Sequence, residues 1–115
     1  MSFKSIFRDD LFAGQVAIVS GGGSGIGRCI AHELAALGAE VVLASRTLEK
    51  LEGVKQEIQE AGGKAHTFVC NIRKEEEVKA LMAHCVEEYG GVHLLVNNAG
   101  GQFMAPPETI SLKGW

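Results

Sequence analysis

A cluster of glycines near the amino terminus has the residue types and spacing to bind phosphate. Residues 20–27 read Ser-Gly-Gly-Gly-Ser-Gly-Ile-Gly, with an apolar run before them and helical spacing after them. Unpaired N–H groups at a helix start carry about half a positive charge, and glycines let backbone approach a phosphate closely. Glycines alone make only tight turns, but a strand before and a helix after are the context of a dinucleotide site. We expect the pyrophosphate to contact Gly21, Gly23, Ser24, Gly25, Ile26 and Gly27, with a hydroxyl donor from Ser24.

Arg46 occupies the position that selects between the two nicotinamide cofactors. It follows the second predicted strand, about 20 residues beyond Gly27, where an acidic side chain would accept from a ribose 2′-hydroxyl. A guanidinium in that position pairs bidentately with a 2′-phosphate, so Arg46 beside Ser45 predicts NADP rather than NAD. The alternative is a solvated arginine, because arginine is normally exposed. Arg28 is a weaker candidate, since the prediction places it within a helix and facing solvent.

Four short apolar runs predict strands, and three stripes of helical spacing lie between them. The runs are residues 15–19, 40–44, 65–69 and 92–96. Thr47 is a plausible N-cap, and paired or single glycines end the helices. The apolar stripes are Ile26, Ile30, Leu34 and Leu37, then Leu51, Val54, Ile58 and Ala61, then Val78, Leu81, Met82, Cys85 and Val86.

This alternation predicts an α/β fold of the Rossmann type, a doubly wound parallel sheet in the order 3-2-1-4. Strands joined by helical crossovers pair in parallel with right-handed connections, and the order changes direction beside the first strand. Residues 1–115 are expected to form the N-terminal part of one NADP-binding domain, with no second domain. The fourth strand would lack an outer neighbour, which predicts an exposed edge and marginal stability in isolation.

Composition narrows the function classes. The chain has 115 residues, 46% of them hydrophobic, and a formal charge of -3, which gives no basic field for nucleic acid. The three cysteines are odd in number and lie in periodic segments, which favours a reduced compartment. No spacing of histidine and cysteine favours a metal site, and no apolar run reaches the roughly 18 residues of a membrane span. A soluble, cytoplasmic protein is expected, with neither nucleic acid nor membrane as a partner.

Two motifs together resemble the short-chain dehydrogenase/reductase family. They are Ser20-Gly21-x-x-x-Gly25-Ile26-Gly27 and Asn97-Asn98-Ala99-Gly100. The family usually has threonine at Ser20 and aspartate at Asn71, where the side-chain oxygen accepts from the adenine amine. The resemblance implies that Asn71 and Ile72 flank the adenine. It also implies that Asn98, Ala99 and Gly100 line the ribose and nicotinamide.

A closer likeness is to the peroxisomal trans-2-enoyl-CoA reductase branch of that family and its bacterial relatives. It rests on residues 70–73, 97–103 and 111–115. The resemblance implies NADPH-dependent hydride transfer to an acyl-CoA or enoyl-CoA substrate in fatty acid metabolism, a homo-oligomer when complete, and a peroxisomal location as the alternative compartment. Gln102 and Phe103 either edge the substrate cleft or form a surface loop.

The family's catalytic set is a tyrosine with a lysine four residues later, helped by a serine and an asparagine. Tyr89 is the one tyrosine in the sequence, and His93 stands four residues on. No catalytic residue is therefore assigned, and the 115-residue chain alone is expected to be inactive. The alternatives are an alcohol or 3-oxoacyl dehydrogenase of the same family and a non-catalytic nucleotide-binding module. A redox or interaction protein using the cysteines is a third hypothesis, which their spacing does not support.

Overall fold

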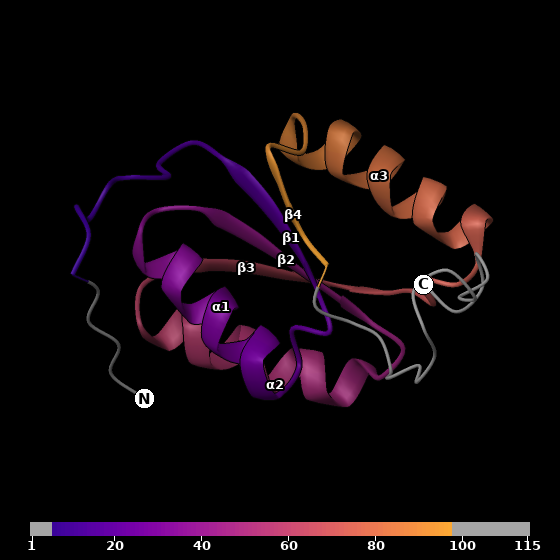
Figure 1. Ribbon diagram of the computed structural model, residues 1–115, viewed down its shortest axis with the longest axis horizontal. Helices are drawn as coiled ribbons and strands as arrows, with labels where there is room; N and C mark the ends of the chain where they lie inside the picture. The colour runs from indigo at the N-terminus through magenta and orange to yellow at the C-terminus, as the bar shows by residue number, and fades with distance from the viewer. Residues whose placement is uncertain (1–5, 98–115) are drawn as a thin grey trace, which may run out of the picture.

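Strands and helices alternate strictly along the chain. A computed structural model describes residues 6–97, and Figure 1 shows its elements. The strands are β1 (Val16–Ser20), β2 (Glu40–Ser45), β3 (Lys64–Val69) and β4 (Leu94–Val96), and the helices are α1 (Gly25–Ala36), α2 (Leu48–Glu60) and α3 (Glu75–Tyr89).

The four strands form one parallel sheet in the order β3-β2-β1-β4, as predicted. Ser20 at the end of β1 is paired with Ala44 of β2, and Val19 with Val96 of β4. The chain winds outward from β1 to β3 and then returns to the other side of β1. The topological switch point, where this class of sheet opens a ligand crevice beyond its carboxyl edge, therefore lies between β1 and β4.

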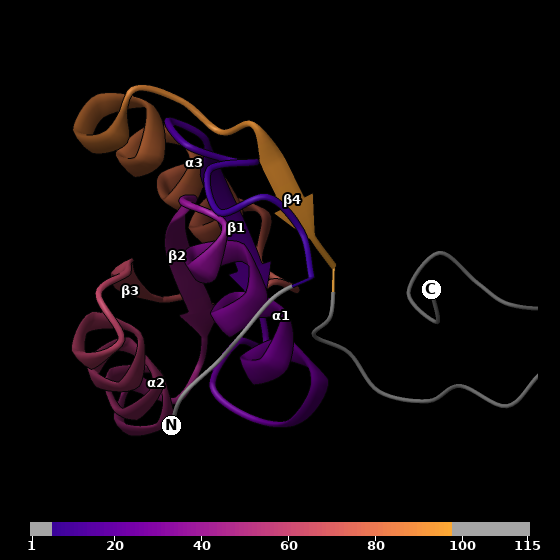
Figure 2. The ribbon, with the colours of Figure 1, turned by 90° about the vertical axis from the view of Figure 1, so that its left-hand side faces the viewer.

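The helices cover the two faces of the sheet unequally. Helices α1 and α2 lie on one face and α3 on the other, as Figures 1 and 2 show. Alternate residues of each strand enter one of two cores, because successive side chains point to opposite faces. Ala17, Val19, Val41 and Leu43 pack under α1 and α2, whereas Val16, Ile18, Val42 and Ala44 pack under α3.

Each of the three predicted apolar stripes contains a residue that the structure exposes, which in the second stripe is Ala61, just after the end of α2. Ile26 is 73% exposed because it lies in the first turn of α1, beside the glycine-rich loop, while Ala31, Leu34 and Ala35 form the buried stripe. Met82 and Val86 of α3 are 37% and 60% exposed, although Leu81 and Cys85 are buried as expected. Their exposure has a physical cause: α3 is the one helix on its face of the sheet within residues 6–97.

Strand β4 is shorter than the predicted run of residues 92–96. Its ladder with β1 begins at Ala17 and Leu94. The N–H of Val16 donates to the ring Nδ1 of His93 at 2.9 Å, while the N–H of His93 donates to the carbonyl of Val16. A side chain thus takes the place of a backbone acceptor, and the regular strand starts one residue later.

Candidate functional site

The loop after β1 takes its shape from glycines at two positions with positive φ. Gly21 has φ +68°, and its N–H donates to the carbonyl of Ala44 in β2 at 2.8 Å, which extends the β1–β2 ladder one residue beyond the end of β1. Gly25 has φ +57° and opens α1. Residues with a Cβ rarely adopt this conformation, so these two glycines are required by the backbone path itself.

At Gly22 and Gly23, neighbouring atoms leave little room for a Cβ. A Cβ on Gly22 would lie 2.7 Å from Cδ2 of Leu43, and one on Gly23 would lie 2.9 Å from Cβ of Lys50 in α2. A Cβ on Gly25 would meet nothing within 4 Å. The glycines of the loop therefore have two different roles. Gly22 and Gly23 let the loop pack closely against β2 and α2, whereas Gly25 has no atom in the way of a Cβ and is needed for its positive φ.

Helix α1 begins at Gly25, after an N-cap serine. Ser24 is the N-cap in extended conformation, and its side chain makes no capping hydrogen bond in the part of the chain that the structure describes. The first turn of a helix leaves its N–H groups without partners in the helix, and their partial positive charge favours an anion. Ser24, Gly25 and Ile26 are exposed while Gly27 is buried. This helix start can accept a phosphate group.

The hydroxyl of Ser20 has a structural partner. Its Oγ donates to the carbonyl of Val96 at 3.0 Å, and Ser20 is only 4% exposed. This bond holds the end of β1 to the end of β4 at the switch point. A threonine, which the family resemblance leads one to expect here, carries the same donor.

The end of β2, which lies next to the end of β1, presents an exposed arginine. Ser45 is half-buried, and its Oγ accepts from the N–H of Thr47 at 3.2 Å. Thr47 is the N-cap of α2, as predicted, although its own side chain makes no capping bond within residues 6–97. Arg46 is exposed, and its side chain has neither a hydrogen bond nor an ion pair among the described residues. It is therefore available to an anionic ligand.

The end of β3 brings the predicted adenine residues beside Arg46. The N–H of Cys70 donates to the carbonyl of Ser45 at 2.8 Å, so the next residue, Asn71, lies close to the end of β2. The Oδ1 of Asn71 accepts from the N–H of Arg73 at 3.0 Å. One lone pair of the predicted adenine acceptor is thus used in a local turn, and a second remains, since an amide oxygen has two.

Four apolar side chains are exposed close to the carboxyl ends of the strands. Ile26 and Ile72 were predicted, but sequence reasoning missed Leu48 in the first turn of α2 and Val69 at the end of β3. Their exposed fractions lie between 42% and 73%. The signal that was missed is the presence of large apolar residues at strand–helix junctions.

Arg28 does not face solvent as expected. Its Nε and Nη2 donate to the two carboxylate oxygens of Glu57 in α2, at 2.8 and 2.7 Å. His32, one turn further along α1, contacts Oε1 of the same carboxylate at 2.9 Å. Hydrogen bonds from Arg28 and His32 lower the pKa of Glu57 to about 2. Arg28 is thus engaged by the protein, which leaves Arg46 as the exposed cation at the end of β2.

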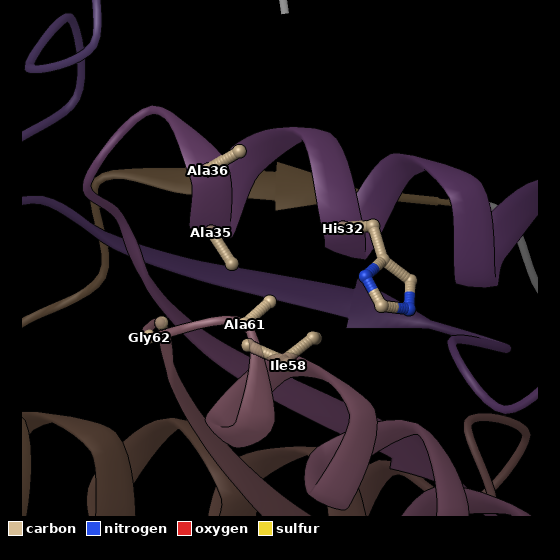
Figure 3. A pocket seen from close by; sticks show the side chains of 7 residues that line it. His32, Ala35, Ala36, Ile58, Ala61 and Gly62 are labelled. Atoms are coloured by element: carbon tan, nitrogen blue, oxygen red, sulfur yellow. The ribbon is translucent and has the colours of Figure 1, made fainter. Parts of the chain in front are cut away.

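A small cleft opens at the other end of α1 and α2. Its volume is about 130 Å³, and Figure 3 shows its lining side chains, which include His32, Ala36, Ile58 and Ala61. A nucleotide needs a cleft of roughly 300 Å³ or more, so this one is too small. Within residues 6–97 no group of three or more His, Cys, Asp or Glu residues is arranged to hold a metal ion, and no helix is long and apolar enough to cross a membrane.

These features define the class of protein. The family model described as short chain dehydrogenase matches residues 15–115, and the chain belongs to this family of oxidoreductases. The predicted family is confirmed. The motif residues Asn98, Ala99 and Gly100, together with Gln102 and Phe103, lie outside the described residues.

Relatives within the family share the fold over most of this chain. The chain is 34% identical to a peroxisomal 2,4-dienoyl-CoA reductase of Danio rerio over 98% of this chain and 38% of that protein. A solved structure named as a citronellol catabolism dehydrogenase of Pseudomonas aeruginosa PAO1 is 57% identical, with a TM-score of 0.83 over 97% of this chain and 46% of that one. A metagenomic short-chain oxidoreductase solved in complex with NADP is 41% identical, with a TM-score of 0.77 over 88% of this chain and 46% of that one. The chain thus spans less than half the length of these relatives.

Proposed function

We propose that this chain carries the pyrophosphate and adenosine part of an NADP(H) site in a short-chain oxidoreductase that transfers hydride. The observation that carries the proposal is the exposed Arg46 at the end of β2, unpaired among the described residues, at the same edge of the sheet as the loop that leads from β1 into α1. A 2′-phosphate gives that guanidinium a bidentate partner. The relative solved with NADP supports the same cofactor.

The residues divide by the part of the cofactor that each would contact. Ser45 and Arg46 would hold the 2′-phosphate, and Asn71 and Ile72 would flank the adenine. Asn98, Ala99 and Gly100, beyond the described residues, would line the ribose and nicotinamide. The backbone of the loop and of the first turn of α1 would bind the pyrophosphate through Gly21, Gly23, Ser24, Gly25, Ile26 and Gly27.

The proposed substrate is an acyl-CoA or enoyl-CoA thioester. The support is the relative named as a 2,4-dienoyl-CoA reductase, at 34% identity. A second candidate is a dehydrogenase with a different substrate in the same family, favoured by the 57% identity to the protein named for citronellol catabolism. Hydride transfer, the substrate and a homo-oligomer belong in either case to a protein that also carries the family's catalytic residues. The chain of 115 residues by itself would then be inactive, as the N-terminal part of a single NADP-binding domain.

Calorimetric titration with NADP⁺ and NAD⁺ tests the cofactor. The unmodified chain should prefer NADP⁺, and Arg46→Ala should weaken NADP⁺ binding about tenfold or more, since a charged hydrogen bond contributes about 1.5–3 kcal/mol. NAD⁺ affinity should not change. Arg8→Ala is the matched control, because Arg8 is exposed and pairs with Asp10 in the segment before β1, which is hydrogen-bonded to the C-terminal end of α1. Equal affinity of the unmodified chain for both cofactors would contradict the assignment of Arg46.

A further inference from the structure

Helix α1 is fastened to α2 through one carboxylate. Arg28 and His32 lie four residues apart on α1 and therefore share a face of the helix. Both contact Glu57 of α2, Arg28 through a two-pronged pair at 2.7 and 2.8 Å and His32 at 2.9 Å. Figure 3 shows the ring of His32 directed from α1 toward α2. Three contacts to one group restrict both rotation of α1 about its axis and sliding along α2.

These contacts are partly withdrawn from water. His32 is 2% exposed, and the side chains of Arg28 and Glu57 are about one-third exposed. The carboxylate accepts hydrogen bonds from both partners, so the ring of His32 must present an N–H to it. Glu57 stays ionised at neutral pH, because these hydrogen bonds hold its pKa at about 2. Glu57 therefore meets Arg28 as a carboxylate at neutral pH.

Arg28, the residue of α1 that pairs with Glu57 through two hydrogen bonds, lies within the first turn of the helix. The N–H of Arg28 donates to the carbonyl of Ser24 at 3.2 Å, which is the first hydrogen bond of the helix. The preceding N–H groups of that turn are the donors proposed for the pyrophosphate. On the other side of the loop, Gly23 packs against Lys50 in the first turn of α2. Helix α2 thus supports the loop and the helix start at two separate points.

We infer that Glu57 is a positioning residue for the dinucleotide, one that fixes the α1 start relative to the end of β2. NADP carries a pyrophosphate and a 2′-phosphate, and both must be met at once, by the first turn of α1 and by Arg46. The separation between these two subsites depends on how α1 lies against α2. Glu57 sets that separation without touching the ligand. The inference rests on the proposed NADP site and adds a residue to it that no motif contains.

The test compares a ligand that spans both subsites with one that occupies a single subsite. NADP⁺ and adenosine 2′-monophosphate are titrated by NMR into the unmodified chain, Glu57→Gln and Glu60→Gln. Glu60 is the control, because it lies exposed on the same helix and contacts only Gln56 among the described residues. Glu57→Gln should weaken NADP⁺ binding about tenfold and leave binding of the 2′-monophosphate unchanged. Glu60→Gln should alter neither.

Other outcomes would overturn the inference. Unchanged NADP⁺ affinity in Glu57→Gln would do so, and so would equal losses for both ligands, which would indicate a general loss of structure. Tighter NADP⁺ binding would mean that Glu57 withholds the charge of Arg28 rather than positioning the helix. If Glu57→Gln does not fold, Arg28→Lys replaces it, since lysine keeps the charge but not the two-pronged geometry, and the same selective loss is expected. Failure of the unmodified chain to bind NADP⁺ would instead refute the proposed function.

Discussion

The contact between Glu57 and Arg28 should make part of the protein's stability depend on pH. The folded state lowers the pKa of Glu57 from 4.5 to about 2. A carboxylate whose pKa is depressed on folding stabilises the folded state fully above the unfolded pKa, and loses this contribution as the pH falls through the folded pKa. The stabilisation should be complete above about pH 5, decline through pH 4 and be nearly absent at about pH 2.

The magnitude follows from the shift and the exposure. At about 1.4 kcal/mol per pKa unit, the shift corresponds to about 3 kcal/mol. The Glu57 side chain is 31% exposed, and solvent screens such pairs, so we expect a contribution of about 1–2 kcal/mol at pH 7. Glu57→Gln should lower the free energy of unfolding by this amount.

Urea denaturation at pH 7 and pH 3 measures the difference between the two proteins at each pH. Comparing the unmodified chain with Glu57→Gln cancels the titration of all other carboxylates. The difference should shrink by more than half at pH 3, whereas Glu60→Gln should show little difference at either pH. A loss that is the same at both pH values would refute the electrostatic reasoning and indicate a packing defect.

Three further outcomes are expected. Gly23→Ala should weaken NADP⁺ binding and lower the melting temperature, because the added Cβ would lie 2.9 Å from Cβ of Lys50 in α2. Gly53→Ala is the control within α2: its Cβ would meet no atom within 4 Å, and the change should raise the free energy of unfolding in urea by about 0.5–1 kcal/mol. Ser20→Ala should cost about 1 kcal/mol through loss of the bond to β4, and Ser20→Thr should retain it; equal stability of all three proteins in urea would contradict this role. A thiol reagent should label Cys29 rapidly in the folded chain and the two buried cysteines only after unfolding, because burial raises their pKa and blocks access.

The sheet order was predictable because it depends on connectivity. Apolar runs separated by helical stripes leave few parallel topologies, and the handedness of the crossovers removes most of those. The exposed positions were not predictable in the same way. Periodicity shows which side of a helix is apolar, but not which part of that side the neighbouring elements cover. Ile26 and Val86 were placed on the correct helices and wrongly expected to be buried for this reason.

Only the local part of the candidate site could be predicted from the sequence. The glycine-rich loop and Arg46 could be recognised because each is defined by residues that are close together in the sequence or at a fixed spacing. The contact of Glu57 with Arg28 and His32 joins residues on two helices, 29 and 25 positions apart. Nothing in the spacing of charged residues shows where two helices cross, so this contact needed the structure.

The close packing of Gly22 and Gly23 against β2 and α2 couples the phosphate loop to folding. A loop that takes its shape from the core cannot persist when that core is lost, so a ligand that needs the loop binds the folded state alone. Such a ligand shifts the folding equilibrium by mass action, by about 2.7 kcal/mol at one hundred times its dissociation constant. The midpoint of unfolding should therefore rise with nucleotide concentration, which makes thermal melting a measure of cofactor affinity even where no reaction can be followed.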